Sequence, residues 1–246
     1  MHGIDLLGLC ALIFVAAVLY SMVGHAGASG YLAAMALYGV SPAAMKPTAL
    51  TLNILVAIVG TTQFARAGHF SWRLFWPFAL GSVPLAYLGG ALALPVPVYK
   101  TILGIVLVFA ALRLFVSAPR ADSAPLRAAP RPLAAACGAG IGFLSGLTGV
   151  GGGIFLSPVI LLMRWADAKR TAAVSVAFIL ANSIAGLLGH VSSVHSLPRE
   201  IAPLAGVALA GGIIGSTLGS RRLPSPALRR MLAIVLVVAA AKLIFA

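Results

Sequence analysis

Residues 142–162 read GFLSGLTGVGGGIFLSPVILL, an apolar stretch with a cluster of glycines near its middle. The cluster, Gly149-Val-Gly-Gly-Gly153, closes one long apolar run and opens a second at 154–163, which is too short to cross a membrane as a straight helix. Glycine costs about 1 kcal/mol per residue in a helix relative to alanine, so the backbone should unwind at the cluster. Unwound backbone inside a membrane must line protein or water, and the stretch therefore predicts a broken helix within a membrane bundle.

The composition of the whole chain excludes a water-soluble fold. Of the 246 residues, 61% are hydrophobic and 9% are charged, whereas soluble domains carry about a quarter charged residues. A β-barrel would instead need short segments of alternating hydrophobicity. The formal charge of +13 arises from basic residues that fall mainly between apolar runs. This placement predicts contact with membrane lipid headgroups and no nucleic-acid partner.

Apolar runs and the residues that interrupt them predict the membrane spans. A spanning helix takes about 20 apolar residues, and the chain offers eight candidates. These candidates lie at 4–24, 48–65, 74–94, 98–117, 132–148, 172–190, 201–219 and 227–245. Two shorter apolar stretches, 31–40 and 154–163, each follow a glycine cluster. The expected fold is all-α, a polytopic transmembrane helical bundle with glycine-broken segments.

Two internally repeated halves are predicted. The polar segment 118–131 is expected to link a first transmembrane repeat at 1–117 to a second at 132–246. Residues about 125 to 129 positions apart match in order. The matches pair Gly24, Gly27 and Ala28 with Gly149, Gly152 and Gly153, and then His69 with His195, Pro77 with Pro203 and Gly89 with Gly215. Four crossings per half would make the repeats parallel, whereas a broken stretch that changes sides would invert them, and both alternatives stay open.

The two glycine clusters, 24–30 and 149–153, are the strongest indication of a binding site. A helix that starts after unwound backbone presents free N–H groups and the positive end of its dipole, which favour an anion. The alternative is that the glycines only allow close helix packing. The candidate substrate-binding residues are Gly24, Gly27, Ser29, Gly30, Asn53, Thr148, Gly149, Gly151, Gly152, Gly153, Ser175 and Asn182.

Polar side chains within or near the spans have two interpretations each. A carboxamide in mid-span, as at Asn53 and Asn182, is costly unless it finds a polar cavity or bonds to another helix. Ser157 and Ser183 lie nearby as further hydrogen-bonding groups. Lys46 and Arg170 precede the second span of each half, where a headgroup anchor is favoured over attraction of an anion.

The spans lack certain residue types, and this excludes some functions. The carboxylates, Asp5, Asp122, Asp167 and Glu200, fall outside the interiors of the spans, which disfavours cation transport and acidic proton relays. No nucleotide-binding phosphate loop is present, so transport would be secondary, without a cofactor. The histidines at 25, 69, 190 and 195 lie at span ends without metal-site spacing. The expected function is secondary transport of a small anion, and not an enzyme activity.

Two other functions remain as alternatives. One is transport of another small metabolite or a metal ion. The other is intramembrane proteolysis, because Gly27-Ala28-Ser29-Gly30 has the G-x-S-G form found around a nucleophilic serine, with His190 as its base. The oligomeric state is also open, and a homo-oligomer is one alternative.

The chain resembles the TauE/SafE family of membrane proteins over nearly its whole length. The resemblance is carried by residues 142–162, with the pattern S-G-x-x-G-x-G-G-G at 145–153, by KRTAAVSVAFILANSIAGLLGH at 169–190, and by GHAGASGYLAAMALYG at 24–39. It implies a multi-pass transporter of the bacterial inner membrane for sulfite, organosulfonates or related small anions.

Overall fold

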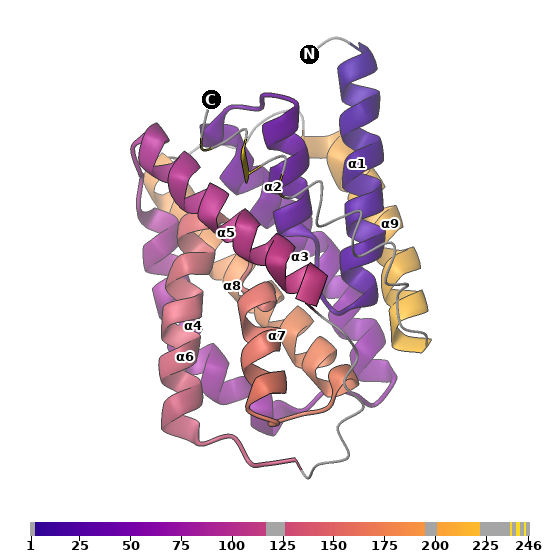
Figure 1. Ribbon diagram of the computed structural model, residues 1–246, viewed down its shortest axis with the longest axis vertical. Helices are drawn as coiled ribbons and strands as arrows, with labels where there is room; N and C mark the ends of the chain where they lie inside the picture. The colour runs from indigo at the N-terminus through magenta and orange to yellow at the C-terminus, as the bar shows by residue number, and fades with distance from the viewer. Residues whose placement is uncertain are drawn as a thin grey trace.

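The computed structural model describes residues 3–116, 126–194 and 201–221, together with the single residues 237, 240, 241 and 244. These residues form helices joined by short connections, with no strand among them (Figure 1). The helices are α1 (Gly3–Met22), α2 (Ala28–Leu37), α3 (Pro42–Arg66), α4 (Trp72–Ala91), α5 (Val96–Val116), α6 (Arg131–Thr148), α7 (Gly153–Leu162), α8 (Ala168–Val194) and α9 (Ile201–Arg221). The all-α fold class is therefore confirmed.

Both predicted helix breaks are present, between α1 and α2 and between α6 and α7. Gly27 precedes α2 with a φ of 111°, and Gly152 precedes α7 with a φ of 83°. Residues with a Cβ avoid this left-handed region, whereas glycine enters it at no steric cost. The glycines thus determine where the chain turns into each short helix.

The predicted spans correspond to α1, α3, α4, α5, α6, α8 and α9. α3 starts at Pro42, six residues before the predicted span, because proline fits the first turn of a helix, where its missing N–H is not needed. Among the described residues, α3, α4, α8 and α9 are long and apolar enough to cross a membrane. The span predicted at 227–245 lies mostly outside the described residues, so the count of eight stays a prediction.

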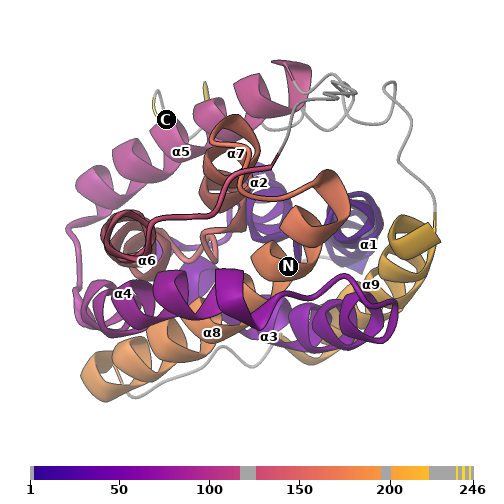
Figure 2. The same ribbon diagram turned by 90° about the horizontal axis from the view of Figure 1, so that it is seen from below.

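Helices of the first half of the chain pack against helices of the second half. α4 packs along α6, α9 packs along α1, and α3 lies against α8 (Figures 1 and 2). Glycine makes the first two contacts close, because a Cβ at Gly142 would clash with the Ser82 backbone and one at Gly215 would clash with the Val18 carbonyl. The polar residues Asn53 of α3 and Asn182 of α8 are fully buried in this arrangement.

The corresponding helices of the two halves run in opposite directions. In Figure 1, α1 runs down from the N-terminus at the top of the bundle, whereas α6 starts at the lower end and rises. The short helix α2 lies in the upper part of the bundle and α7 in the lower part. The orientation is therefore the inverted one of the two alternatives. The division into sequence repeats joined by 118–131 stays a prediction, since 117–125 lie outside the described residues.

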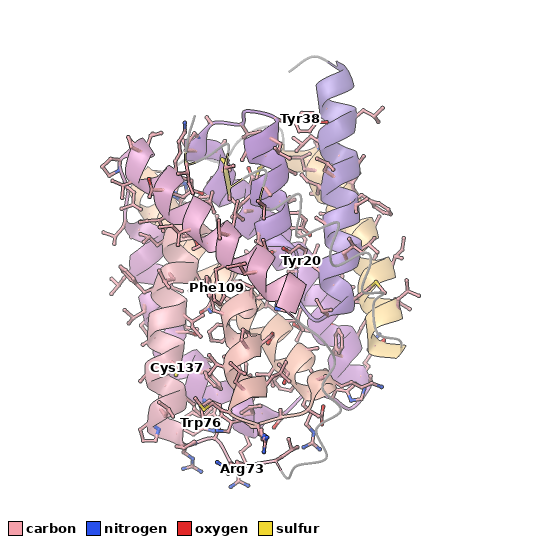
Figure 3. All side chains as sticks on the ribbon, viewed as in Figure 1. Tyr20, Tyr38, Arg73, Trp76, Phe109 and Cys137 are labelled. Atoms are coloured by element: carbon pink, nitrogen blue, oxygen red, sulfur yellow. The ribbon has the colours of Figure 1, made fainter. Side chains whose placement is uncertain are left out.

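The two ends of the bundle carry aromatic and basic side chains. Arg73 and Trp76 lie near its lower end and Tyr38 near its upper end (Figure 3). The guanidinium of Arg131 lies 5.6 Å from the centre of the Trp76 ring. Such residues are typical of the membrane–water interface. Exposed leucines on α4 and α8, among them Leu88 and Leu188, present an apolar surface suited to lipid.

Candidate functional site

Buried polar side chains of α3 and α8 contact the glycine segment before α7. A Cβ added at Gly151 would lie 2.6 Å from Nδ2 of Asn53 and 3.3 Å from Oγ of Ser183. One added at Gly152 would lie 3.4 Å from Nδ2 of Asn182. Asn53, Asn182 and Ser183 are fully buried, and we call them the carboxamide cluster. They reach the backbone only because the glycines lack side chains.

Asn53 is held in a defined orientation. Its Nδ2 donates to Oγ of Ser183 at 3.3 Å and to the carbonyl oxygen of Val150 at 3.5 Å. Since a carbonyl can only accept, the atom that faces Val150 must be the amide nitrogen. The other carboxamide atom, Oδ1, is buried and has no hydrogen-bond partner among the described residues. Asn53 therefore bonds α3 to α8 and still presents an acceptor.

Asn182 is buried, and its carboxamide has no partner among the residues that the structure describes. Neither Nδ2 nor Oδ1 makes a hydrogen bond within the described part of the chain. Leaving such a group unsatisfied costs about 1–3 kcal/mol, and most buried polar side chains have a partner. The alternative that Asn182 bonds to another helix requires a partner that the described helices do not supply. Its position favours a polar ligand beside Gly152.

The N-terminus of α7 faces the same place. Gly152 precedes the helix, and the N–H groups of Phe155 and Leu156 bond back to its carbonyl. The N–H groups that precede these two in the first turn have no acceptor within the helix. They lie at the positive end of the helix dipole. Together with the Asn182 carboxamide, they form an arrangement suited to an anion.

His25 brings the first glycine segment to the second. Its Nε2 lies 3.1 Å from Oγ of Ser157 on α7, which lies 2.8 Å from Oγ of Ser175 on α8. A Cβ at Gly153 would lie 3.1 Å from Cδ2 of the His25 ring. Although His25 lies at the end of a predicted span, the unwound segment directs its ring toward α7. His25, Ser157 and Ser183 were not among the predicted site residues, although both serines lie close to predicted ones in sequence.

The first glycine segment is filled by tyrosines. The ring of Tyr31 covers Gly27, and its hydroxyl donates to the carbonyl of Ala26. The Ser29 hydroxyl donates to the Tyr20 hydroxyl at 2.8 Å. The remaining glycines here face backbone or apolar atoms: Gly24 meets the backbone of Ala172, and Gly30 meets Ala16 and the Tyr20 ring. The structure does not bring Gly24, Gly27, Ser29 or Gly30 into the carboxamide cluster.

The other predicted residues lie at the edge of the site. Oγ1 of Thr148 donates to the carbonyl of Leu144 at 2.7 Å, within its own helix. Gly149 lies against the backbone of Lys46. Ser175 is joined to His25 through Ser157, as described above. The structure therefore gathers Asn53, Gly151, Gly152, Gly153 and Asn182 at one place, and sets the others around it.

Lys46 is a buried helix cap and not a headgroup anchor. Its side chain is 6% exposed, and Nζ donates to the carbonyls of Gly90 at 2.8 Å, Gly89 at 3.2 Å and Leu92 at 3.4 Å. These carbonyls end α4, where a positive charge is favoured. The anchor prediction is wrong for Lys46 because α3 starts before it and carries it into the bundle. Arg170, by contrast, is exposed and pairs with Asp167 at 3.7 Å.

Replacing Lys46 with methionine is expected to lower the free energy of unfolding by about 2 kcal/mol. Each hydrogen bond to a charged group contributes about 1.5–3 kcal/mol, and removal of a buried charge offsets part of the loss. The melting temperature of the detergent-purified protein measures the effect. Lys169→Met, which removes an exposed lysine at the start of α8, is the control. Equal melting temperatures for the two variants would contradict the cap.

Comparison of the sequence with known proteins assigns the chain to a family. A family profile described as "Sulfite exporter TauE/SafE" matches residues 9–243. The chain belongs to the TauE/SafE family. The matched range contains both glycine segments and the carboxamide cluster. Family membership and the apolar helices together identify the chain as a membrane transporter.

Two similar proteins carry names consistent with TauE/SafE membership. The probable membrane transporter protein y4hK of Sinorhizobium fredii is 46% identical over 245 residues, which cover 98% of this chain and 99% of that protein. A probable membrane transporter protein of Methanocaldococcus jannaschii is 26% identical over 200 residues, 77% of this chain and 74% of that protein. No solved structure matches the chain.

Proposed function

We propose that this TauE/SafE protein is a secondary transporter of a small anion, namely a sulfur-containing anion such as sulfite or an organosulfonate. We further propose that it is a multi-pass protein of the bacterial inner membrane, with the substrate and membrane lipids as its partners. The observation that carries the substrate proposal is the unpartnered Asn182 carboxamide, buried beside the N-terminus of α7. A sulfur oxyanion presents several acceptor oxygens, which match the amide and the first-turn N–H groups.

Charges near the site support an anion over a cation. The Asp167 carboxylate is exposed at the start of α8, where it pairs with Arg170. The described residues also contain no group of three His, Cys, Asp or Glu side chains that could hold a metal ion. A cation at this place would meet the positive end of the α7 dipole without a counter-charge. The positive end of the α7 dipole thus supports an anion over the alternative of a metal ion.

Transport into vesicles tests the proposal directly. The purified protein in proteoliposomes is expected to take up labelled sulfite or a short organosulfonate, while empty liposomes do not. The same anion should raise the melting temperature of the detergent-purified protein, since a ligand at 100 times its Kd stabilises by about 2.7 kcal/mol. Movement of metal cations without movement of any anion would overturn the proposal.

Replacing Ser29 with alanine separates transport from proteolysis. The variant is expected to retain transport and to lose about 1 kcal/mol of stability, because the buried Tyr20 hydroxyl loses its partner. A nucleophile would need a base to accept its proton, and the Ser29 hydroxyl donates to a phenol instead. Transport rate and melting temperature are the measurements. Complete loss of activity at an unchanged melting temperature would instead support Ser29 as a nucleophile.

A further inference from the structure

The carboxamide cluster presents hydrogen-bond acceptors as well as donors. Oδ1 of Asn53 has no partner in the described part of the chain, because the Val150 carbonyl fixes Nδ2 on the other side of the group. Asn182 presents one oxygen and one amide nitrogen in either orientation of its carboxamide, and both lack a partner among the described residues. Among the described residues, the cluster therefore has two carboxamide oxygens and one amide nitrogen without a hydrogen-bond partner.

The two carboxamides approach neighbouring residues of the glycine segment through their Nδ2 atoms. Asn53 approaches Gly151 and Asn182 approaches Gly152, and neighbouring Cα atoms are about 3.8 Å apart. The same glycines are lined on their other sides by Ile141, Phe178 and Ile179. A ligand seated beside Gly152 would thus meet the Asn182 carboxamide together with an apolar wall.

A fully deprotonated oxyanion would pair with the hydrogen-bond donors of this site but not with its acceptors. Its oxygens would accept from Nδ2 of Asn182 and from the first turn of α7. The two carboxamide oxygens would stay unpaired and would face negative charge. A buried acceptor without a donor is costly, and a site that contains one discriminates strongly against ligands that cannot donate.

We infer that the substrate of this site is an anion that carries its own hydrogen-bond donor, either a singly protonated oxyanion or a short sulfonate with a hydroxyl or amino group. Its anionic oxygens lie toward the N-terminus of α7 and Nδ2 of Asn182. Its donor points to Oδ1 of Asn53 or of Asn182. The inference rests on the proposed anion transport and adds to it the class of anion.

Binding to the wild-type protein is compared for matched anions. The first pair is 2-hydroxyethanesulfonate and ethanesulfonate, which have the same charge and differ by one hydroxyl group. The second comparison is sulfite below and above the pH at which it loses its last proton, with ethanesulfonate, whose charge stays constant, as the control for effects of pH on the protein. The Kd is measured from the ligand dependence of the melting temperature.

The donor-bearing form is expected to bind about tenfold more tightly in at least one of the two comparisons. A preference in the first assigns the donor to a functionalised sulfonate, and a preference in the second assigns it to the protonated inorganic anion. Equal or tighter binding of the donor-free form in both comparisons would overturn the inference and leave anion transport standing. Binding of none of these anions would overturn the proposed function itself.

Asn53→Leu provides a second test of the same assignment. It removes one acceptor oxygen, so the ratio of affinities for the hydroxylated and plain sulfonates is expected to fall toward one. An unchanged ratio would exclude Asn53 Oδ1 as the acceptor. The wild-type comparison decides the inference even if this variant fails to fold.

Discussion

Replacing Asn182 with leucine is expected to abolish anion transport and, at the same time, to raise the stability of the substrate-free protein. The side chain is fully buried on α8, and both of its polar atoms lack partners among the described residues. Leucine is similar in branching and size and needs no hydrogen bonds. Removal of the unsatisfied group should therefore contribute about 1–3 kcal/mol to the free energy of unfolding. Uptake into proteoliposomes and thermal unfolding without substrate measure the two effects.

Asn53→Leu is the matched control for Asn182→Leu. Asn53 bonds to Ser183 and Val150, so its replacement is expected to lower stability and not to raise it. Opposite shifts in melting temperature would show that Asn182 is retained for its function at a cost in stability. Wild-type transport rates in Asn182→Leu would remove this residue from the site, and a destabilised Asn182→Leu protein would indicate a structural partner.

Replacing Gly152 with leucine is expected to eliminate substrate binding. The residue has a φ of 83°, and a Cβ there would lie 3.0 Å from both Ile141 and Phe178 and 3.4 Å from Asn182. The side chain would fill the space in front of the amide and disfavour the turn into α7. Membrane insertion should be retained, because it depends on the apolar spans. Ligand-dependent melting temperature and the amount of protein in membranes are measured together.

Gly140→Leu is the control for Gly152→Leu. Gly140 lies in α6, the helix that leads to the same glycine segment, and a Cβ there would have open space around it. This variant is expected to insert, fold and bind as the wild type does, since leucine is favoured over glycine within a helix. Normal substrate binding by Gly152→Leu would rule out the proposed site.

The positions of the helices and their breaks follow from local properties of the sequence. Hydropathy locates α4, α5, α6 and α9 to within a few residues, because each span needs an apolar stretch of fixed length wherever it lies in the bundle. The breaks at Gly27 and Gly152 are predictable for a similar reason. Glycine alters the cost of helical backbone at its own position, and no partner elsewhere in the chain is required.

The sequence could not predict that the two glycine clusters have different neighbours. Both clusters turn the chain into a short helix, as their matching spacing indicates. Their surroundings differ, because Tyr31 covers Gly27 whereas carboxamides from distant helices lie beside Gly151 and Gly152. A match between glycines cannot reveal which side chains will fill the space beside them. The binding site that we propose therefore lies at one cluster, although both were predicted to contribute.

The sequence by itself thus determined a membrane bundle of helices, the two places at which helices break, and the kind of residue available to bind an anion. Only the tertiary structure decided which of these residues meet, since Asn53 and Ser183 are 130 positions apart, and it alone placed Lys46 beneath the end of α4. The physical reason is that helix formation and insertion depend on neighbours along the chain and on the solvent. Hydrogen bonds and burial between helices depend on how the whole bundle packs.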